Sequence, residues 1–278
     1  MTELDLSGDG TDPAPPARYY NESLARGLRI LQLFGENSQW LSLSEVGRMA
    51  GLSPATAHRL LSTLAQLGFI ERSPTTRKYR PGLSVLKLGY SALQASDIHA
   101  LARPYLERLA DDTGETVNMG VLAGNSVLYV QRIERHELVT ADIHVGSTLP
   151  AYATSIGKLL LAFLSDEDLR TRITGTRLVK YGPNTIGTRA ALIAALGEIR
   201  SQGWAYQDEE TAVGLRSIAA PIRNRGGEVA AGINIAVAAS RMSLNDLVKK
   251  LLPVLRETAF RISALSDPTS QPYSEELH

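Results

Sequence analysis

The first ninety residues carry short apolar stripes separated by polar positions, and the stripes recur at helical spacing. Between Asn21 and Asn37 the apolar residues stand three or four positions apart, at Leu24, Leu28, Leu31 and Phe34. A repeat of about 3.6 residues places such positions on one side of a helix. The pattern therefore predicts an amphipathic first helix in this segment.

A short second helix is predicted from the signals at its two ends. Ser42 is followed three residues later by Glu45, which is the pattern of a capping box. Gly51 stands where a left-handed residue commonly follows the end of a helix. The second helix should therefore occupy about residues 43–50.

A third helix should follow after a short turn, because Ser53 and Pro54 supply an N-cap and a proline for the first helical position. It is expected to run to about Leu67, with an apolar stripe at Ala57, Leu60, Leu61, Leu64 and Leu67. Its other face carries small and hydrogen-bonding groups around a single Arg, namely Ala55, Thr56, Arg59, Ser62, Thr63 and Gln66. Such a face suits a helix inserted in the major groove of duplex DNA.

Two strands, residues 69–72 and 77–80, are predicted around the turn Ser73-Pro74-Thr75-Thr76, and they form a hairpin with a basic arm. A helix, a capped helix, a short turn, a polar-faced helix and a basic hairpin, in this order, predict a winged helix-turn-helix. We assign this domain to residues 20–82. A linker helix is predicted at 83–97, with an apolar side free for a partner at Leu83, Leu86, Tyr90 and Leu93.

The remainder of the chain mixes helices with antiparallel hairpins. The predicted helices are 98–113, 155–164, 189–202 and 244–265. The predicted hairpins pair strands 116–122 with 127–133 and strands 218–222 with 229–236. This mixture predicts an α+β domain over residues 98–266, so the fold class is two-domain, a winged helix-turn-helix followed by an α+β domain.

Charge is divided unevenly along a chain whose formal net charge is zero. Between Arg18 and Tyr90, ten Lys and Arg residues stand against four Glu residues, which favours a nucleic-acid partner for this part. Residues 1–19 begin with acidic residues, prolines and glycines, a composition typical of a disordered tail. Residues 267–278 are expected to form a flexible tail.

Composition excludes several classes of function. The chain has no Cys, and its five His residues do not stand at metal-ligand spacing, so neither a disulfide scaffold nor a metal site is expected. No apolar run is long enough to span a bilayer, and no signal peptide is evident at the N-terminus. We therefore expect a cytoplasmic protein without a membrane partner, a metal or a cofactor.

Enzymatic and RNA-binding alternatives find little support. Asp142, His144 and Ser155 could be imagined as a hydrolytic triad, and Lys158 as a Schiff-base lysine. However, the chain has no Gly-x-Ser-x-Gly elbow and no nucleotide-binding glycine loop. An RNA-binding module would need interleaved aromatic residues for base stacking, which are missing. We therefore predict no catalytic residue.

Three groups of segments together resemble the IclR family of bacterial transcriptional regulators, over nearly all of residues 21–266. They are residues 52–64 with 68–70, residues 149–162, and residues 208–210 with 214–222 and 232–235. The sequences Pro-Ala-Tyr-Ala-Thr-Ser in the second group and Gly-Leu-Arg-Ser-Ile-Ala-Ala-Pro in the third resemble the subgroup that controls aromatic-acid breakdown through the β-ketoadipate pathway.

The resemblance implies a GAF-like effector-binding domain, a small organic-acid effector, and homodimers joined through the DNA-binding domains and often paired into tetramers. A dimer would bind a pseudo-palindromic operator in double-stranded DNA, because one short recognition helix reads few base pairs. The alternative for the effector is a small carboxylate unrelated to aromatic breakdown.

The DNA-binding residues follow from the third helix and the wing. Arg59 is the candidate for reading guanine, with a phosphate contact as the equal alternative. The other candidates on this helix are Pro54, Ala55, Thr56, Ser62 and Thr63, whose alternative is plain surface exposure. Arg77 and Lys78 of the wing should add affinity that does not depend on sequence. By family position, Arg26 and Ser44 are expected to contact the DNA backbone.

The effector residues centre on the predicted helix start formed by Thr154, Ser155, Ile156 and Gly157. Free backbone N–H groups and the helix dipole favour a carboxylate there, with an ordinary N-cap as the alternative. By family position, the cavity should be lined by Leu149, Ser155, Ile156, Gln207, Ser217 and Asn234. Gln207 and Ala236 depart from residues found in some members, and the apolar Leu149 and Ile156 suit an acid larger than glyoxylate.

Overall fold

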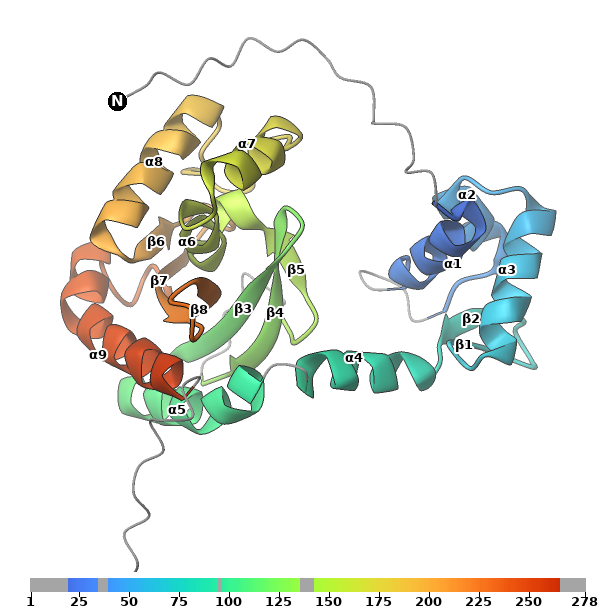
Figure 1. Ribbon diagram of the computed structural model, residues 1–278, viewed down its shortest axis with the longest axis horizontal. Coiled ribbons are helices and arrows are strands. Elements are labelled where there is room, and N and C mark those ends of the chain that lie inside the picture. Colours follow the sequence, from blue (N-terminus) through green and yellow to red (C-terminus); the bar gives the residue numbers. More distant parts are fainter. Residues whose placement is uncertain (1–19, 35–39, 95–96, 136–142, 266–278) are drawn as a thin grey trace, which may run out of the picture. The chain divides into compact units, whose positions relative to one another are not determined.

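The computed structural model describes residues 20–34, 40–94, 97–135 and 143–265 of the chain (Figure 1). The chain divides into two compact units, residues 1–90 and 91–278. The division falls within the predicted linker helix. The tails expected at residues 1–19 and 267–278 lie outside the described residues, so those two expectations stay predictions.

The first unit has the predicted elements of a winged helix-turn-helix. They are α1 (Glu22–Gln32), α2 (Leu43–Ala50), α3 (Pro54–Gln66), β1 (Ile70–Arg72) and β2 (Tyr79–Pro81). Ser42 and Glu45 form the expected capping box of α2, and Gly51 ends the helix in the left-handed region at φ 63°. Ser53 caps α3, and Pro54 is its first residue. The local signals of the sequence thus placed both helices correctly.

Helix α1 buries only the second half of its predicted apolar stripe, since Phe34 lies in the core and Leu31 packs against it. Gly27 and Ile30 are its buried residues, whereas Leu24 and Leu28 are 63% and 52% exposed. Ile30 belongs to a core cluster that also contains Phe34, Leu41, Val46, Leu61, Ile70 and Tyr79. Periodicity identifies an apolar side but does not say whether it faces the core or solvent.

Helix α4 (Ser84–Gln94) agrees with the predicted linker helix. Leu83, just before it, and Leu86 and Leu88 within it are each at least 60% exposed. The side chains of Tyr90 and Leu93, which complete the predicted apolar side, lie outside the described ones. Apolar residues therefore stand in solvent on α4 as well as on α1.

The second unit is built on a six-stranded antiparallel sheet of order β5-β4-β3-β8-β7-β6. The strands are β3 (Thr116–Ala123), β4 (Ser126–Ile133), β5 (Thr148–Pro150), β6 (Ala205–Asp208), β7 (Leu215–Arg223) and β8 (Val229–Ala238). The hairpins β3–β4 and β7–β8 are those expected from the sequence. The edge strands β5 and β6 were not predicted, because three or four residues are too few to show an alternating pattern.

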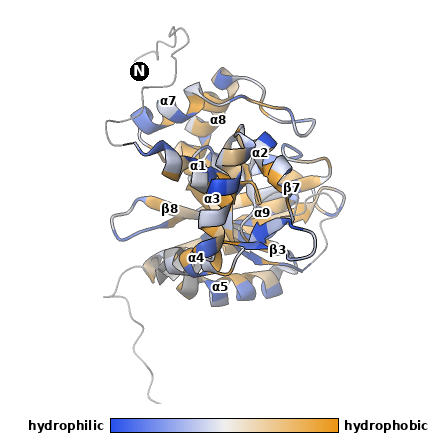
Figure 2. Ribbon diagram, turned by 90° about the vertical axis from the view of Figure 1, so that its right-hand side faces the viewer, coloured by the Kyte–Doolittle hydropathy of each residue, from blue (hydrophilic) through white to orange (hydrophobic). Residues whose placement is uncertain are grey.

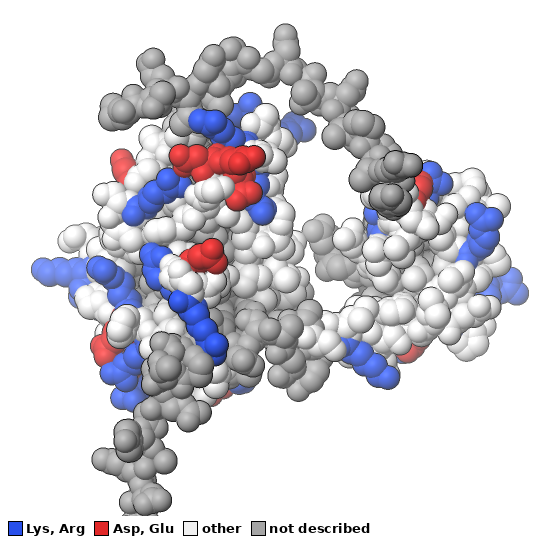
Figure 3. Space-filling model, viewed as in Figure 1, with Lys and Arg blue, Asp and Glu red and all other residues white. Residues whose placement is uncertain are grey.

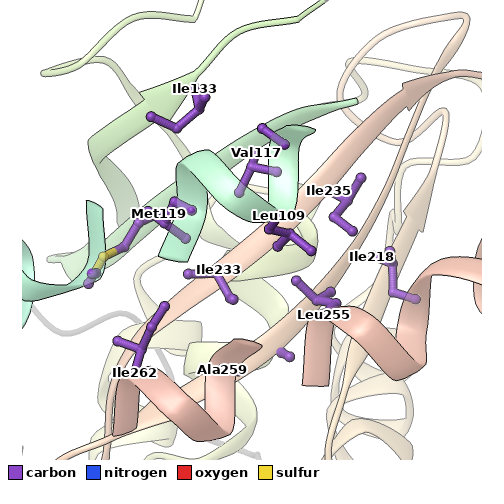
Figure 4. Close-up of a cluster of buried hydrophobic side chains, with 14 of the residues drawn as sticks. Leu109, Val117, Met119, Ile133, Ile218, Ile233, Ile235, Leu255, Ala259 and Ile262 are labelled. Atoms are coloured by element: carbon purple, nitrogen blue, oxygen red, sulfur yellow. The ribbon is translucent and has the colours of Figure 1, made fainter. Parts of the chain in front are cut away.

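One face of this sheet is apolar and is covered by α5 (Asp97–Thr113) and α9 (Leu244–Ala264). Val117, Met119, Ile233 and Ile235 point to this face at alternate positions of β3 and β8, as strand geometry requires (Figure 4). Figure 2 shows β7 and β8 in hydrophobic colours. The pairing of these strands with two amphipathic helices forms the main core of the unit.

The opposite face carries α6 (Ser155–Ala162), which packs against β7 and β8, and α8 (Arg189–Gln202) packs against α6. The 3-10 turn η1 (Ala151–Ala153) precedes α6, and α7 (Asp166–Thr174) follows it. Neither η1 nor α7 was predicted, since α7 is polar over most of its length. Together the two faces form the predicted α+β domain. Within the described ranges, no helix is long and apolar enough to cross a membrane.

Candidate DNA-reading face and effector cavity

The polar face of α3 is open to solvent. Pro54, Ala55, Arg59 and Thr63 are exposed, and Thr56 and Ser62 are half-buried. The Thr56 backbone N–H donates to Ser53 Oγ over 3.3 Å, so the cap fixes the first turn of the helix. Among the described residues, Arg59 makes no ion pair, and its guanidinium is therefore available to another molecule.

The wing separates its basic residues into two groups. Arg80 pairs with Glu71 at 2.6 Å and lies over the Trp40 ring at 4.9 Å from the centroid, so it braces the base of the hairpin. Arg77 and Lys78 stand at the other end, and neither makes an ion pair among the described residues. Figure 3 shows more Lys and Arg than Asp and Glu on the visible face of this unit.

The two candidates on the preceding helices differ in their surroundings. Arg26 Nε donates to Glu22 Oε1 at 2.9 Å within α1, so part of its charge is already compensated. Ser44 is exposed in the first turn of α2, with its Oγ 3.0 Å from Ser42 Oγ. A phosphate contact by Arg26 would compete with its intrahelical ion pair, whereas Ser44 stands in the first turn, where helix N–H groups lack partners within the helix.

A small cavity of about 20 Å³ lies in the second unit, between the start of α6 and the polar side of the sheet. Five of the predicted residues line it, namely Leu149, Thr154, Gln207, Ser217 and Asn234. Ala236, which departs from the family pattern, lines it too, as do residues that were not predicted: Asn118, Tyr129, Arg132, Ile143, Thr211 and Leu215. A cavity of this size holds roughly one water molecule, so a larger ligand needs its walls to move.

The remaining predicted residues, Ser155, Ile156 and Gly157, lie behind the cavity wall. Thr154 is the N-cap of α6, and its Oγ1 accepts from the Gly157 N–H at 2.9 Å. Ile156 is fully buried against the sheet. A Cβ on Gly157 would fall 2.2 Å from the Ala151 carbonyl oxygen, so the glycine permits close packing of η1 on α6.

The Ser155 hydroxyl belongs to a buried hydrogen-bond chain. Its Oγ lies 2.7 Å from Ser217 Oγ, and the Asn234 amide donates to it over 3.3 Å. The Asn118 amide donates to Asn234 Oδ1 at 2.9 Å, and Arg132 in turn donates to Asn118 Oδ1 at 3.0 Å. The backbone N–H groups of Ser155 and of the next residue have no acceptor among the described residues. The chain thus connects the start of α6 to a buried guanidinium.

Sequence reasoning missed Asn118 and Arg132, although they are cross-strand neighbours in the β3–β4 hairpin. An Asn and an Arg inside otherwise apolar strands were the available signal, because polar residues in a buried strand require partners. Tyr129 was missed for another reason. Strict alternation would place Tyr129 and Arg132 on opposite faces, and only an irregularity in β4 brings them together.

A buried ion pair lies beside the site, between Lys158 of α6 and Glu210 after β6, with side-chain exposures of 5% and 7%. Burial lowers the pKa of Lys158 and raises the pKa of Glu210, while their attraction opposes both shifts. Glu210 Oε2 has no hydrogen-bond partner among the described atoms. The pair connects α6 to the loop that follows β6. Because the Lys158 side chain is enclosed by the protein, it is not accessible to a substrate.

The imagined hydrolytic triad has no geometric support in the part of the chain that the structure describes. His144 is exposed, whereas Ser155 is fully buried and bonded to Ser217. Asp142 lies outside the described residues. Within the same ranges, no group of three or more His, Asp or Glu residues could hold a metal ion.

A winged helix-turn-helix followed by a domain with a polar cavity is the architecture of a ligand-responsive DNA-binding regulator. The family model of the IclR helix-turn-helix domain matches residues 23–74, and that of the bacterial transcriptional regulator IclR C-terminal domain matches residues 90–264. The chain therefore belongs to the IclR family of bacterial transcriptional regulators, which bind DNA.

Curated relatives and solved structures agree with this assignment. The chain is 34% identical to the HTH-type transcriptional regulator XynR of Escherichia coli, over 81% of this chain and 90% of XynR. It is 36% identical to the Pca regulon regulatory protein of Pseudomonas putida, over 84% and 80%. An IclR homolog from Microbacterium hydrocarbonoxydans, solved with 4-hydroxybenzoate, is 29% identical with a TM-score of 0.76, over 88% of this chain and 98% of that one.

Proposed function

We propose that the protein controls genes for the breakdown of aromatic acids, and that a small aromatic or related carboxylate bound in the second unit changes its action on DNA. The observation that carries the proposal is the polar cavity at the start of α6, whose lining includes five residues expected from the sequence. The similarity to a Pca regulon regulator and to a homolog that binds 4-hydroxybenzoate supports the aromatic class.

In this proposal the exposed face of α3 enters the major groove. Arg59 would donate to guanine, and the neighbouring groups would contact bases or phosphates through Pro54, Ala55, Thr56, Ser62 and Thr63. Arg77 and Lys78 would hold phosphates beside the recognition helix, and Arg26 and Ser44 would contact the backbone from the preceding helices. The exposure of Arg59 and the lack of ion pairs at Arg77 and Lys78 among the described residues support this arrangement.

The effector would enter the cavity beside the N-terminal end of α6. Leu149, Thr154, Gln207, Ser217 and Asn234 would contact it directly. Ser155, Ile156 and Gly157 would act from behind the wall, by holding Asn234 and Ser217 and by packing α6 on the sheet. A benzoate needs more than about 20 Å³, so we expect half-buried Leu149 and Ile143 to move on binding.

We further propose that the active form is a homodimer that can pair into a tetramer, works in the cytoplasm and binds a pseudo-palindromic operator. Exposed leucines stand close together on each helix, Leu24 and Leu28 on α1 and Leu83, Leu86 and Leu88 at α4, and such groups support the dimer because adjoining apolar side chains commonly mark an interface. Two recognition helices also read enough base pairs for specific binding in a genome.

The proposal is tested by thermal-shift screening with protocatechuate, 4-hydroxybenzoate, cis,cis-muconate and β-ketoadipate, followed by binding to DNA from upstream of the gene in the presence of each acid. A ligand that binds only the folded state raises the melting temperature, by an amount that follows its concentration relative to Kd. We expect at least one acid to raise it and to change DNA binding. A response to glyoxylate or pyruvate instead would reject the aromatic class.

A further inference from the structure

Strand β4 contains one extra residue relative to its partner β3. Met119 pairs with Gln131 but the next residue, Gly120, pairs with Tyr129, so Val130 has no partner and forms a β-bulge. Asn118 pairs with Arg132. Asn118 and Gly120 are two positions apart on β3, so they face the same side of the sheet. The bulge therefore places Tyr129 and Arg132 on one face of the sheet, and both line the cavity.

Arg132 is the only charged side chain among the described residues that line the cavity. Its side chain is 8% exposed. Nη1 donates to Asn118 Oδ1 at 3.0 Å, and Nη2 donates to Glu134 Oε1 at 2.7 Å. Glu134 is 55% exposed, so water screens its charge while the guanidinium stays enclosed. A guanidinium has five N–H donors, which leaves donors for an anion in the cavity.

Tyr129 supplies a second polar group at the same place. It is 2% exposed, and its hydroxyl has no hydrogen-bond partner among the described residues. Burial raises the pKa of this phenol above its usual range, so at neutral pH the group remains a donor. Tyr129 lines the cavity, so a ligand oxygen there could accept a hydrogen bond from this hydroxyl.

We propose that Arg132 and Tyr129 form the anion-binding end of the effector site, and that the ligand is an organic acid whose carboxylate accepts hydrogen bonds from the Arg132 guanidinium. Tyr129 donates to the carboxylate or to a polar substituent beside it, and Asn118 positions the guanidinium. This inference rests on the proposed function, since it names the group that recognises the charge of the effector. It shifts the main charge contact from the start of α6 to β4.

The test compares acids with their neutral amides. Calorimetry is run with 4-hydroxybenzoate and protocatechuate, each beside its carboxamide, on the native protein and on Arg132→Gln, Arg132→Lys and Tyr129→Phe. A hydrogen bond to a charged group is worth roughly a tenfold to hundredfold change in affinity. We expect Arg132→Gln to weaken acid binding by about that factor while amide binding stays within about threefold. Arg132→Lys should keep part of the preference, and Tyr129→Phe should cost up to about tenfold.

Arg135→Gln is the matched control, because Arg135 pairs with Asp111 on the surface and does not line the cavity. Its acid affinity should equal that of the native protein. If an acid binds Arg132→Gln as tightly as the native protein, the assignment of Arg132 is wrong while the proposed function stands. If none of the four screened acids binds the native protein, the proposed function fails and the anion site fails with it. If Arg132→Gln does not fold, the native protein and Arg132→Lys decide the question. Equal affinity of the native protein for an acid and its amide would overturn the inference. A strong preference of the native protein for the acid, kept in part by Arg132→Lys, would support it.

Discussion

Arg59 stands on the exposed side of α3 without an ion pair among the described residues, so its removal should disturb DNA binding and little else. We expect Arg59→Ala to weaken specific binding by roughly 1–3 kcal/mol per half-site if the guanidinium contacts guanine in a bidentate manner. Competition titrations with operator and random DNA measure this effect. Arg170→Ala, an exposed arginine of α7, is the control, and an operator affinity of Arg59→Ala equal to that control would remove Arg59 from the reading face.

Lys158 and Glu210 should behave as a unit, because each compensates the buried charge of the other. Lys158→Met leaves Glu210 enclosed without a counter-ion and should cost about 3–5 kcal/mol in the free energy of unfolding. Lys158→Met combined with Glu210→Gln should recover much of that stability. Urea unfolding of the two variants provides the comparison.

The same pair predicts a pH effect with a definite sign. Burial raises the pKa of Glu210 in the folded state, and removal of Lys158 takes away the attraction that opposes the shift. A raised folded-state pKa favours the folded state as pH falls, since protonation then neutralises the buried charge. The defect of Lys158→Met should therefore shrink as pH falls from 8 toward the ordinary glutamate pKa of 4.5. A defect independent of pH would mean that Glu210 is not the group left unpaired.

At the scale of elements, the start of α2 depends on a carboxylate. Hydrogen bonds from Ser42 lower the pKa of Glu45 below its ordinary value of 4.5. A lowered folded-state pKa means that Glu45 stabilises the fold above pH 4.5 and ceases to do so as pH falls through the folded-state pKa. Glu45→Gln should therefore have a lower free energy of unfolding than the native protein at neutral pH. The difference should decrease toward pH 3, as measured by urea titration at each pH.

The wing offers a separate test, because Arg77 adopts the left-handed region at φ 58°. Glycine takes this conformation without strain, so Arg77→Gly should not destabilise the hairpin. We expect Arg77→Gly with Lys78→Ala to weaken binding to specific and random DNA alike. The log–log salt dependence should fall by about one unit for each phosphate that is no longer neutralised. A changed sequence preference would instead show that the wing reads bases.

At the scale of the whole molecule, the exposed leucines predict assembly. Leu28 of α1 and Leu86 of α4 lie in solvent in the single chain, so Leu28→Glu with Leu86→Glu should leave each chain folded and prevent dimerisation. Sedimentation velocity at micromolar concentration should show a dimer for the native protein and a monomer for the double variant. Val213→Glu, at an exposed position of the second unit, should remain dimeric. A native monomer that binds its operator tightly would contradict the prediction.

The sequence by itself determined the elements whose signals are local. Capping boxes, N-cap serines and a left-handed glycine act within a few residues, which is why α2 and α3 were placed correctly. The long hairpins were also predictable, since each pairs two strand-forming segments across a short turn rich in Gly and Asn. Family position identified four lining residues of the cavity, and the predicted helix start added Thr154, although neither argument separated them from Ser155, Ile156 and Gly157 behind the wall.

Only the tertiary structure decided which apolar residues of α1 face the core and which polar groups meet at the cavity. Leu24 and Ile30 are equally apolar in the sequence, and the packing partners alone bury Ile30. The bulge at Val130 is a property of the pairing between two strands, and it reverses the face on which Tyr129 is expected relative to Arg132. Contacts between segments that are distant in the sequence set both outcomes, whereas local preference does not. The pattern of residue types along the chain therefore does not predict either of them.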